Sequence, residues 1–238
     1  MSEVRTLIFR DERSKRYQEN KSKIKSALLD GNKKLFISLV NIKEFERFMD
    51  EHEFISFEDV VSYVTIPHPT RNYVHRDMLI SSVVKDPSRQ GALDEKLQIK
   101  VCADVGKEHG IIISQLTNVQ LTPSKDGRIL TLGDVRRENL QRPGKLKTFD
   151  AKISGKLDGY ITAKVCIGTG GHQDNVFDEI VSMGNWFIEF QRPETLVILY
   201  DNDFKIDRKT ELLKKTFENT KNVMSFNHVE FQKFLQMF

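Results

Sequence analysis

The residues best suited to chemistry lie in one segment, 147-KTFDAKISGKLDGYITAKVCIGTGGHQDNVFDE-179. It reads as a hairpin of two strands, then a glycine-rich turn and the polar start of a helix. With the hairpin centred on Leu157, Asp150 and Lys164 each lie seven residues from that centre and face each other. Directly opposed residues of paired strands have Cβ atoms about 5 Å apart, and alternate residues share a face, so Thr162 joins this pair.

Two interpretations fit an aspartate opposite a lysine. An exposed cross-strand ion pair is common and contributes only about 0–1 kcal/mol. The residues that follow favour a functional site, because the helix after the glycine turn carries Asp174, Asp178 and Glu179 away from its apolar face. Asp178 and Glu179 follow Lys164 by 14 and 15 residues, so a carboxylate on the helix could reach back to the strand ends.

Two carboxylates and a lysine around one point have a defined chemical use. Carboxylate oxygens bind Mg²⁺, which keeps its remaining coordination sites for water and phosphate oxygens. The metal activates a bound water and offsets charge developing on phosphorus, while the lysine orients the nucleophile or stabilises the same charge. The segment therefore predicts a site that hydrolyses a phosphodiester, with Mg²⁺ as its cofactor.

The elements around this segment predict an α/β (α+β) fold. From the hairpin onward the order is β-β-α-β-α-β-α, which describes a mixed central sheet flanked by helices. Asp201 and Asp203 end a buried strand, where they cap the strand or, as is usual at strand ends in α/β sheets, carry function. The expected elements are strands over 97–103, 111–121, 128–132 and 195–203, and helices over 173–187, 208–219 and 228–238.

Residues 1–90 read as a mainly helical region. Helical spacing predicts helices over 11–30 and 35–52, and a short helix from Ser56 through Tyr63. Proline- and glycine-containing segments over 66–78 and 85–91 are expected to be loops. The second loop separates the helical region from a core expected over residues 91–238.

Composition and charge set broader limits. The chain has 238 residues with 37 basic and 34 acidic side chains, a net charge of +3 that permits a polyanionic partner without requiring one. A basic run, 136-RRENLQRPGKLK-147, immediately precedes the hairpin. Two cysteines without zinc-ligand spacing indicate a reducing compartment. No apolar run approaches about 18 residues and charges interrupt the N-terminus, so we expect a cytoplasmic protein without a membrane partner.

The segment from the hairpin to the buried strand resembles the PD-(D/E)xK nucleases, and among them the type II restriction endonucleases. The family pattern is an acid on one strand followed by acid-x-lysine on the next. Asp150 matches the first acid and Lys164 the lysine, but Thr162 stands in the place of the second acid. Some members have a non-acid there and supply the acid from the following helix, where Glu179 or Asp178 would be the migrated acid.

The resemblance implies a restriction-endonuclease-like core that cuts double-stranded DNA at a short palindrome, as a Mg²⁺-dependent homodimer. Loops around 66–76 and 104–110 are candidates for reading bases. A first-helix glutamate adds a carboxylate in some members, and Glu44 or Glu46 could take that part, with a solvated position as the alternative. The implied catalytic residues are Asp150, Lys164, Glu179 and Thr162, the metal ligands Asp150, Glu179 and Asp178, and the DNA contacts His172, Gln173, Asn175, Arg136, Arg137, Arg142, Lys145 and Lys147.

Other interpretations stay open at this point. The hairpin and glycine turn could cradle phosphate in a nucleic-acid-binding module that does not cleave. The 168-GTGG-171 turn could also serve as an anion nest in an enzyme that acts on a small phosphate ester. Asp158 could be the first acid, although Asp-Gly is typical of a turn. His172 and Gln173 could cap the helix rather than contact phosphate.

Overall fold

The computed structural model describes residues 2–66, 72–85, 90–116, 121–139, 147–167, 173–202 and 208–238. The chain divides into two compact units. One comprises Ile8–Gln90, and the other comprises Gly91–Phe238 together with Met1–Leu7. In the described residues, no helix combines the length and the apolar character needed to cross a membrane.

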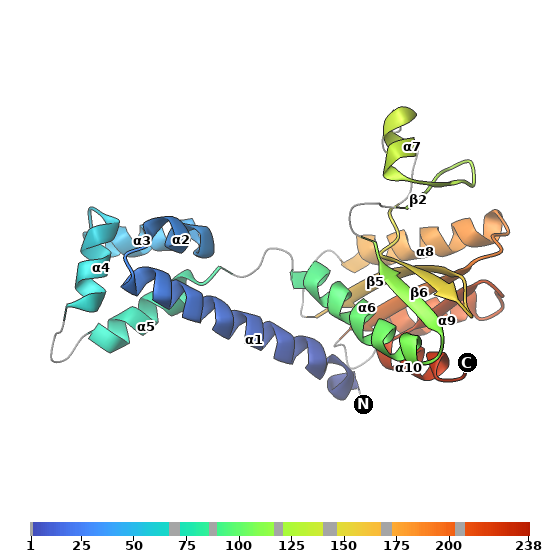
Figure 1. The fold of residues 1–238 in the computed structure, drawn as a ribbon, viewed down its shortest axis with the longest axis horizontal. Coiled ribbons are helices and arrows are strands. Elements are labelled where there is room, and N and C mark those ends of the chain that lie inside the picture. Colours follow the sequence, from blue (N-terminus) through green and yellow to red (C-terminus); the bar gives the residue numbers. More distant parts are fainter. Residues whose placement is uncertain are drawn as a thin grey trace. The chain divides into compact units, whose positions relative to one another are not determined.

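The first unit is built from helices around its own core (Figure 1). Phe36 lies at its centre, with ring centroids 4.9 Å from Phe45 and 5.2 Å from Phe57. A capping box of Ser56 and Asp59 starts the fourth helix. The Asp59 carboxylate accepts from the Ser56 N–H, as a glutamate usually does at this position. The helices are α1 (Ser2–Leu29), of which the part from Ile8 belongs to this unit, α2 (Lys33–Leu39), α3 (Ile42–Glu51), α4 (Phe57–Thr65) and α5 (Asn72–Val83).

Two expectations for this unit were wrong in detail. The single helix predicted over 35–52 is interrupted at Val40, which leaves the helical path to form an isolated β-bridge with Val84. The loop predicted over 66–78 ends earlier, because α5 already begins at Asn72. Of the candidate base-reading loop 66–76, residues 67–71 lie outside the described part and the rest is largely helix.

The second unit is built on a mixed sheet of five strands in the order β1-β4-β5-β6-β7 (Figure 1). β1, β4 and β5 are antiparallel neighbours, whereas β6 and β7 run parallel to β5. The predicted mixed sheet flanked by helices is therefore confirmed. The strands are β1 (Ile111–Gln115), β4 (Ala151–Gly155), β5 (Gly159–Cys166), β6 (Thr195–Asn202) and β7 (Val223–Phe226).

Helices cover both faces of this sheet. Ile153 and Ile161 point to one face, where they form a core with Cys102 and Phe231. Tyr160 points to the other face and packs with another helical layer. Because both faces are covered, every residue of β5 from Gly159 to Val165 is buried. The helices are α6 (Gln90–Glu108) and α10 (His228–Leu235) on the first face, and α8 (Gln173–Glu189) and α9 (Arg208–Phe217) on the second.

The strand predicted over 97–103 is wrong, because these residues form the middle of α6. Period-two alternation over so short a stretch imitated a strand. The buried positions Asp94, Gln98, Ile99 and Cys102 recur at spacings of four, one and three, which is the pattern of a helix face. The predicted loop 104–110 is wrong for the same reason, since α6 continues to Glu108.

A small arm interrupts the chain between β1 and β4. It consists of a two-stranded ribbon, β2 (Thr122–Pro123) and β3 (Ile129–Leu130), followed by α7 (Leu132–Arg137). The predicted turn at Asp126-Gly127 joins the two strands, and Gly127 takes a φ of +85° there. The strands predicted over 111–121 and 128–132 are shorter than expected, because β1 ends at Gln115.

Candidate active site

Three charged side chains meet at the carboxyl end of β5. The ammonium of Lys164 lies 2.8 Å from Glu95 Oε1 and 4.0 Å from Asp150 Oδ2. The lysine side chain is 5% exposed, while the two carboxylate side chains are 20% and 23% exposed, so the acids are more accessible to solvent than the lysine. Glu95 comes from α6, Asp150 is the residue just before β4, and Lys164 lies toward the end of β5.

The hairpin places Asp150 near Lys164 in a register that differs from the predicted one. Ala151 pairs with Ile161, so the hairpin is centred on Lys156 and Asp150 is not directly opposite Lys164. The difference of two residues keeps both side chains on the same face, as diagonal neighbours. A difference of one residue would have sent the lysine to the opposite face.

Backbone hydrogen bonds fix Asp150 in this place. Its N–H donates to the Ile161 carbonyl at 2.8 Å, and its Oδ2 accepts from the Ala163 N–H at 2.8 Å. The carboxylate thus satisfies a strand amide beyond the last paired residue of β4. Asp150 is therefore held by the sheet itself and needs no flexible partner to keep its position.

Sequence reasoning missed Glu95. The strand assigned to 97–103 separated this residue from the helix that carries it. The glutamates considered for an additional carboxylate lie in the other unit, where Glu44 pairs with Arg47 at 2.6 Å and Glu46 is exposed. A helical interpretation of 90–108 would have pointed to Glu95, because it lies one turn before the buried Ile99 and next to the buried Asp94.

The environment acts differently on the two partners of the buried pair. Burial raises the pKa of the Glu95 carboxyl, and the charge of Lys164 opposes only part of that rise. Burial alone would lower the pKa of Lys164, but the charges of Asp150 and Glu95 outweigh it and the net pKa is raised. The lysine therefore stays a cation at neutral pH and supplies the positive charge that holds the two acids together.

A second ion pair lies beside this centre. Lys147, just before the hairpin, contacts Glu179 of α8, with Nζ 2.9 Å from Oε2. The charge of Lys147 also lowers the pKa of Glu95, which places this ion pair near the centre. Glu179 and its neighbour Asp178 are both exposed, and Glu179 is the one that pairs with Lys147. Thr162, in the place of the second acid, is 2% exposed.

Several predicted site residues lie outside the description. His172, Arg142 and Lys145 belong to segments whose structure is not described, and so does the 168-GTGG-171 turn. Gln173 and Asn175 are in the first turn of α8, but their side chains are not described. Asp158 lies in the turn at the far end of the hairpin, where its carbonyl accepts from the Thr195 N–H at 3.0 Å.

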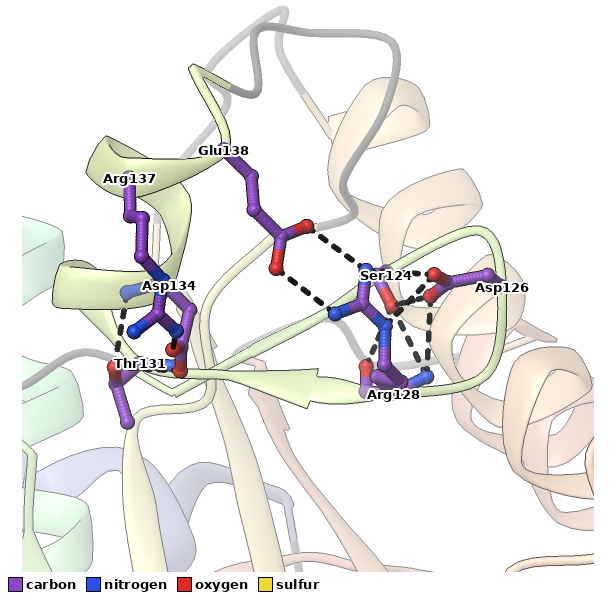
Figure 2. A network of polar contacts seen from close by, with 7 residues as sticks. All are labelled: Ser124, Asp126, Arg128, Thr131, Asp134, Arg137 and Glu138. Carbon is purple, nitrogen blue, oxygen red and sulfur yellow. Dashed lines mark hydrogen bonds and ion pairs between the residues drawn. The ribbon is translucent and has the colours of Figure 1, made fainter.

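The arm presents part of the basic run on an ordered support (Figure 2). The guanidinium of Arg128 donates to both oxygens of Glu138 at 2.9 Å and, through Nε, to Asp126 at 2.8 Å. Arg128 therefore ties the hairpin turn to the C-terminal end of α7. In α7, Arg137 is paired with Asp134, which also forms a capping box with Thr131. Within the described residues, the exposed Arg136 has no ion-pair partner.

The arm is anchored to α8. Trp186 Nε1 donates to the Ser124 carbonyl at 2.7 Å, and Arg192 donates to the Gly127 carbonyl at 3.2 Å. A Cβ at Gly127 would lie 2.5 Å from the Phe190 ring, so this turn requires glycine both for its φ and for the close approach. The arm is thereby a fixed part of the unit that carries the site.

Another acid, Asp201, lies at the end of the neighbouring strand, β6. Its Oδ2 accepts from Gln98 Nε2 at 2.6 Å and from the His228 N–H at 3.1 Å, and its Oδ1 lies 2.9 Å from His228 Nδ1. Cys102 contacts the backbone carbonyl of His228 rather than its ring, and burial raises the pKa of its thiol. This cluster joins α6 to α10 and does not form a nucleophile–base pair.

The donor set at Lys164 fits a Mg²⁺ site of the kind that substrate completes. Mg²⁺ is usually held by one or two carboxylates together with waters and substrate phosphates, and Glu95 and Asp150 provide two. Among the described residues, no group of three or more histidine, cysteine, aspartate or glutamate side chains is gathered closely enough to hold a metal by itself.

No model of a known protein family matches the chain, and no curated protein and no solved structure matches it.

Proposed function

We propose that this protein is a Mg²⁺-dependent endonuclease that hydrolyses phosphodiester bonds of double-stranded DNA, of the type II restriction endonuclease kind. The observation that carries the proposal is the meeting of Glu95, Asp150 and Lys164 at the end of β5. The antiparallel hairpin β4–β5 followed by α8 and the parallel strand β6 supports it, because this is the order in which the resembling nucleases present their site.

Each residue of the centre has a separate task in this proposal. Asp150 and Glu95 would hold the metal, which when bound lowers the pKa of a coordinated water and offsets charge at phosphorus. Lys164, kept protonated by the two acids, donates a hydrogen bond to the attacking water or to a phosphate oxygen. Its burial makes this charge effective, since electrostatic stabilisation is stronger where water is excluded. Thr162 fills the vacated acid position without a charge.

Contacts to the DNA backbone are proposed for basic residues near the centre. Arg136 on α7 is exposed, and Lys147 lies three residues before Asp150 with 36% of its side chain exposed, so both are suited to phosphate contacts, which position a duplex without reading its sequence. Arg128 has its donors committed to Glu138 and Asp126 and serves to hold the arm. A homodimer acting on a palindromic target follows from the symmetry of such sites and belongs to the same proposal.

The test is the cleavage of plasmid DNA with and without Mg²⁺. We expect discrete fragments that require the metal, and a loss of roughly 100- to 1,000-fold in cleavage rate for Lys164→Ala, as for other electrostatic groups removed from an active site. DNA binding should be largely kept. Lys152→Ala is the matched control, because Lys152 is an exposed lysine on the adjacent strand β4. Undiminished cutting by Lys164→Ala would remove the proposed site, and binding without cutting by the wild type would favour a non-catalytic binding module.

A further inference from the structure

The contact between Lys147 and Glu179 joins a residue that the proposed function assigns to a DNA phosphate and an acid that it leaves without a role. Lys147 is suited to a DNA phosphate, and Glu179 is the acid that the resembling nucleases would bring to the metal. In the structure the two side chains satisfy each other, with Nζ 2.9 Å from Oε2. Neither residue can serve its proposed partner fully while this contact persists.

The surroundings of Lys147 place this contact at the edge of the centre. Lys147 precedes Asp150 by three residues, its charge lowers the pKa of Glu95, and its ammonium is bound to Glu179, so the pair lies near the central acids. The pair and the centre together carry three carboxylates and two ammonium groups, those of Glu95, Asp150, Glu179, Lys147 and Lys164. If Lys147 leaves for a phosphate, one positive charge leaves the centre and one carboxylate becomes free, and both changes favour a divalent cation.

We propose that Lys147 and Glu179 form a substrate-operated contact, in which a DNA phosphate takes Lys147 and thereby releases Glu179 to the metal site. This inference rests on the proposed function and adds to it a coupling between the two ligands. DNA then raises the affinity for the metal, and by thermodynamic reciprocity the metal raises the affinity for DNA by the same factor. Without DNA, Lys147 keeps the site in a state of low metal affinity.

The size of the effect follows from the exposure of the pair. The Lys147 side chain is 36% exposed and the Glu179 side chain 42% exposed, and ion pairs in such positions are weak enough for a phosphate to displace. An exposed pair limits the expected coupling to roughly fivefold. The pair therefore favours binding of the metal after DNA, but it does not prevent the metal from binding alone.

The experiment measures Mn²⁺ affinity by titration calorimetry, with and without a short random-sequence duplex. We expect the wild type to bind Mn²⁺ about three- to fivefold more tightly with the duplex than without it. Lys147→Gln should bind Mn²⁺ more tightly than the wild type in the absence of DNA and should lose the coupling. Glu179→Gln should bind Mn²⁺ weakly in both conditions. Glu189→Gln, which removes an exposed acid at the other end of α8, is the control and should match the wild type.

The double variant separates release of Glu179 from simple removal of a charge. If Lys147 acts through Glu179, Lys147→Gln should raise Mn²⁺ affinity much less in the Glu179→Gln background than in the wild type. Equal increases in both backgrounds, or full coupling in Lys147→Gln, would overturn the inference while leaving the nuclease proposal intact. If Glu95→Gln bound Mn²⁺ as tightly as the wild type does, both this inference and the nuclease proposal would be overturned.

Discussion

Two acidic clusters lie at the ends of neighbouring strands, and they differ in almost every respect except position. Asp201 ends β6 beside Val165 of β5, and Lys164 is the preceding residue. Both clusters also draw on α6, which contributes Gln98 to the first and Glu95 to the second. Both clusters are therefore supported by α6 and by the carboxyl ends of β5 and β6. They differ in the partners of their acids.

Asp201 has a complete set of hydrogen-bond partners. It is 2% exposed and both of its oxygens are occupied by Gln98 and His228. Asp150 and Glu95 instead share one ammonium and remain about a fifth exposed. A satisfied and buried acid contributes to the fold, whereas acids that share a counter-ion and face solvent can accept an outside cation. This distinction cannot be drawn from the residue types alone.

The largest contrast is expected in stability. Asp201→Ala leaves the donors of Gln98 and His228 buried without an acceptor, and should lower the free energy of unfolding by about 3 kcal/mol. Asp150→Ala, at a partly exposed position, should lower it by about 1 kcal/mol. Urea denaturation of the two variants measures the contrast. A larger loss for Asp150→Ala would mean that the roles of the two clusters are reversed.

The next contrast is in pH dependence. Because burial raises the pKa of Glu95 above 4.5, the folded chain holds this proton more tightly than the unfolded chain does. The contribution of this group to stability is present below pH 4.5 and is lost as pH rises through the raised pKa. The free energy of unfolding of the wild type should therefore fall relative to that of Glu95→Gln over this range and then level off.

Urea denaturation of the wild type and Glu95→Gln at closely spaced pH values tests this sign. Glu44→Gln is a suitable control, because Glu44 pairs with Arg47 on the surface of the helical unit. A wild type that gains stability relative to Glu95→Gln as the pH rises would show that the attraction of Lys164 outweighs the burial of the carboxyl.

The smallest contrast concerns the arm. Arg136→Gln should weaken DNA binding similarly for all sequences and reduce the slope of log affinity against log salt by about one, as expected for one lost phosphate contact. Arg128→Gln should weaken binding by no more than about fivefold with little change in that slope, because Arg128 holds α7 and contacts no phosphate. Fluorescence anisotropy over a series of salt concentrations distinguishes the two. Equal changes of slope would show that both arginines reach the DNA.

The sequence was sufficient for the parts of the fold that are fixed by local pattern. The hairpin, α8 and β6 follow from alternation, glycine turns and an apolar helix face, and the nearness of Asp150 and Lys164 survived an error in register because that error was even. Glu95 could not be placed, since its nearness depends on the packing of α6 against the sheet. The pairing of Lys147 with Glu179 likewise joins residues 32 positions apart.

The hydrogen bond from the Ala163 N–H to Asp150 Oδ2 has a consequence for ion selectivity. With that oxygen in use by the strand, Asp150 offers a cation chiefly its other oxygen, Oδ1. Ca²⁺ takes about six to eight oxygens and often grips a carboxylate with both, whereas Mg²⁺ uses single carboxylate oxygens and retains waters. We therefore expect the site at the end of β5 to bind Mg²⁺ in preference to larger cations. This preference comes from a backbone N–H, which occupies one oxygen of Asp150.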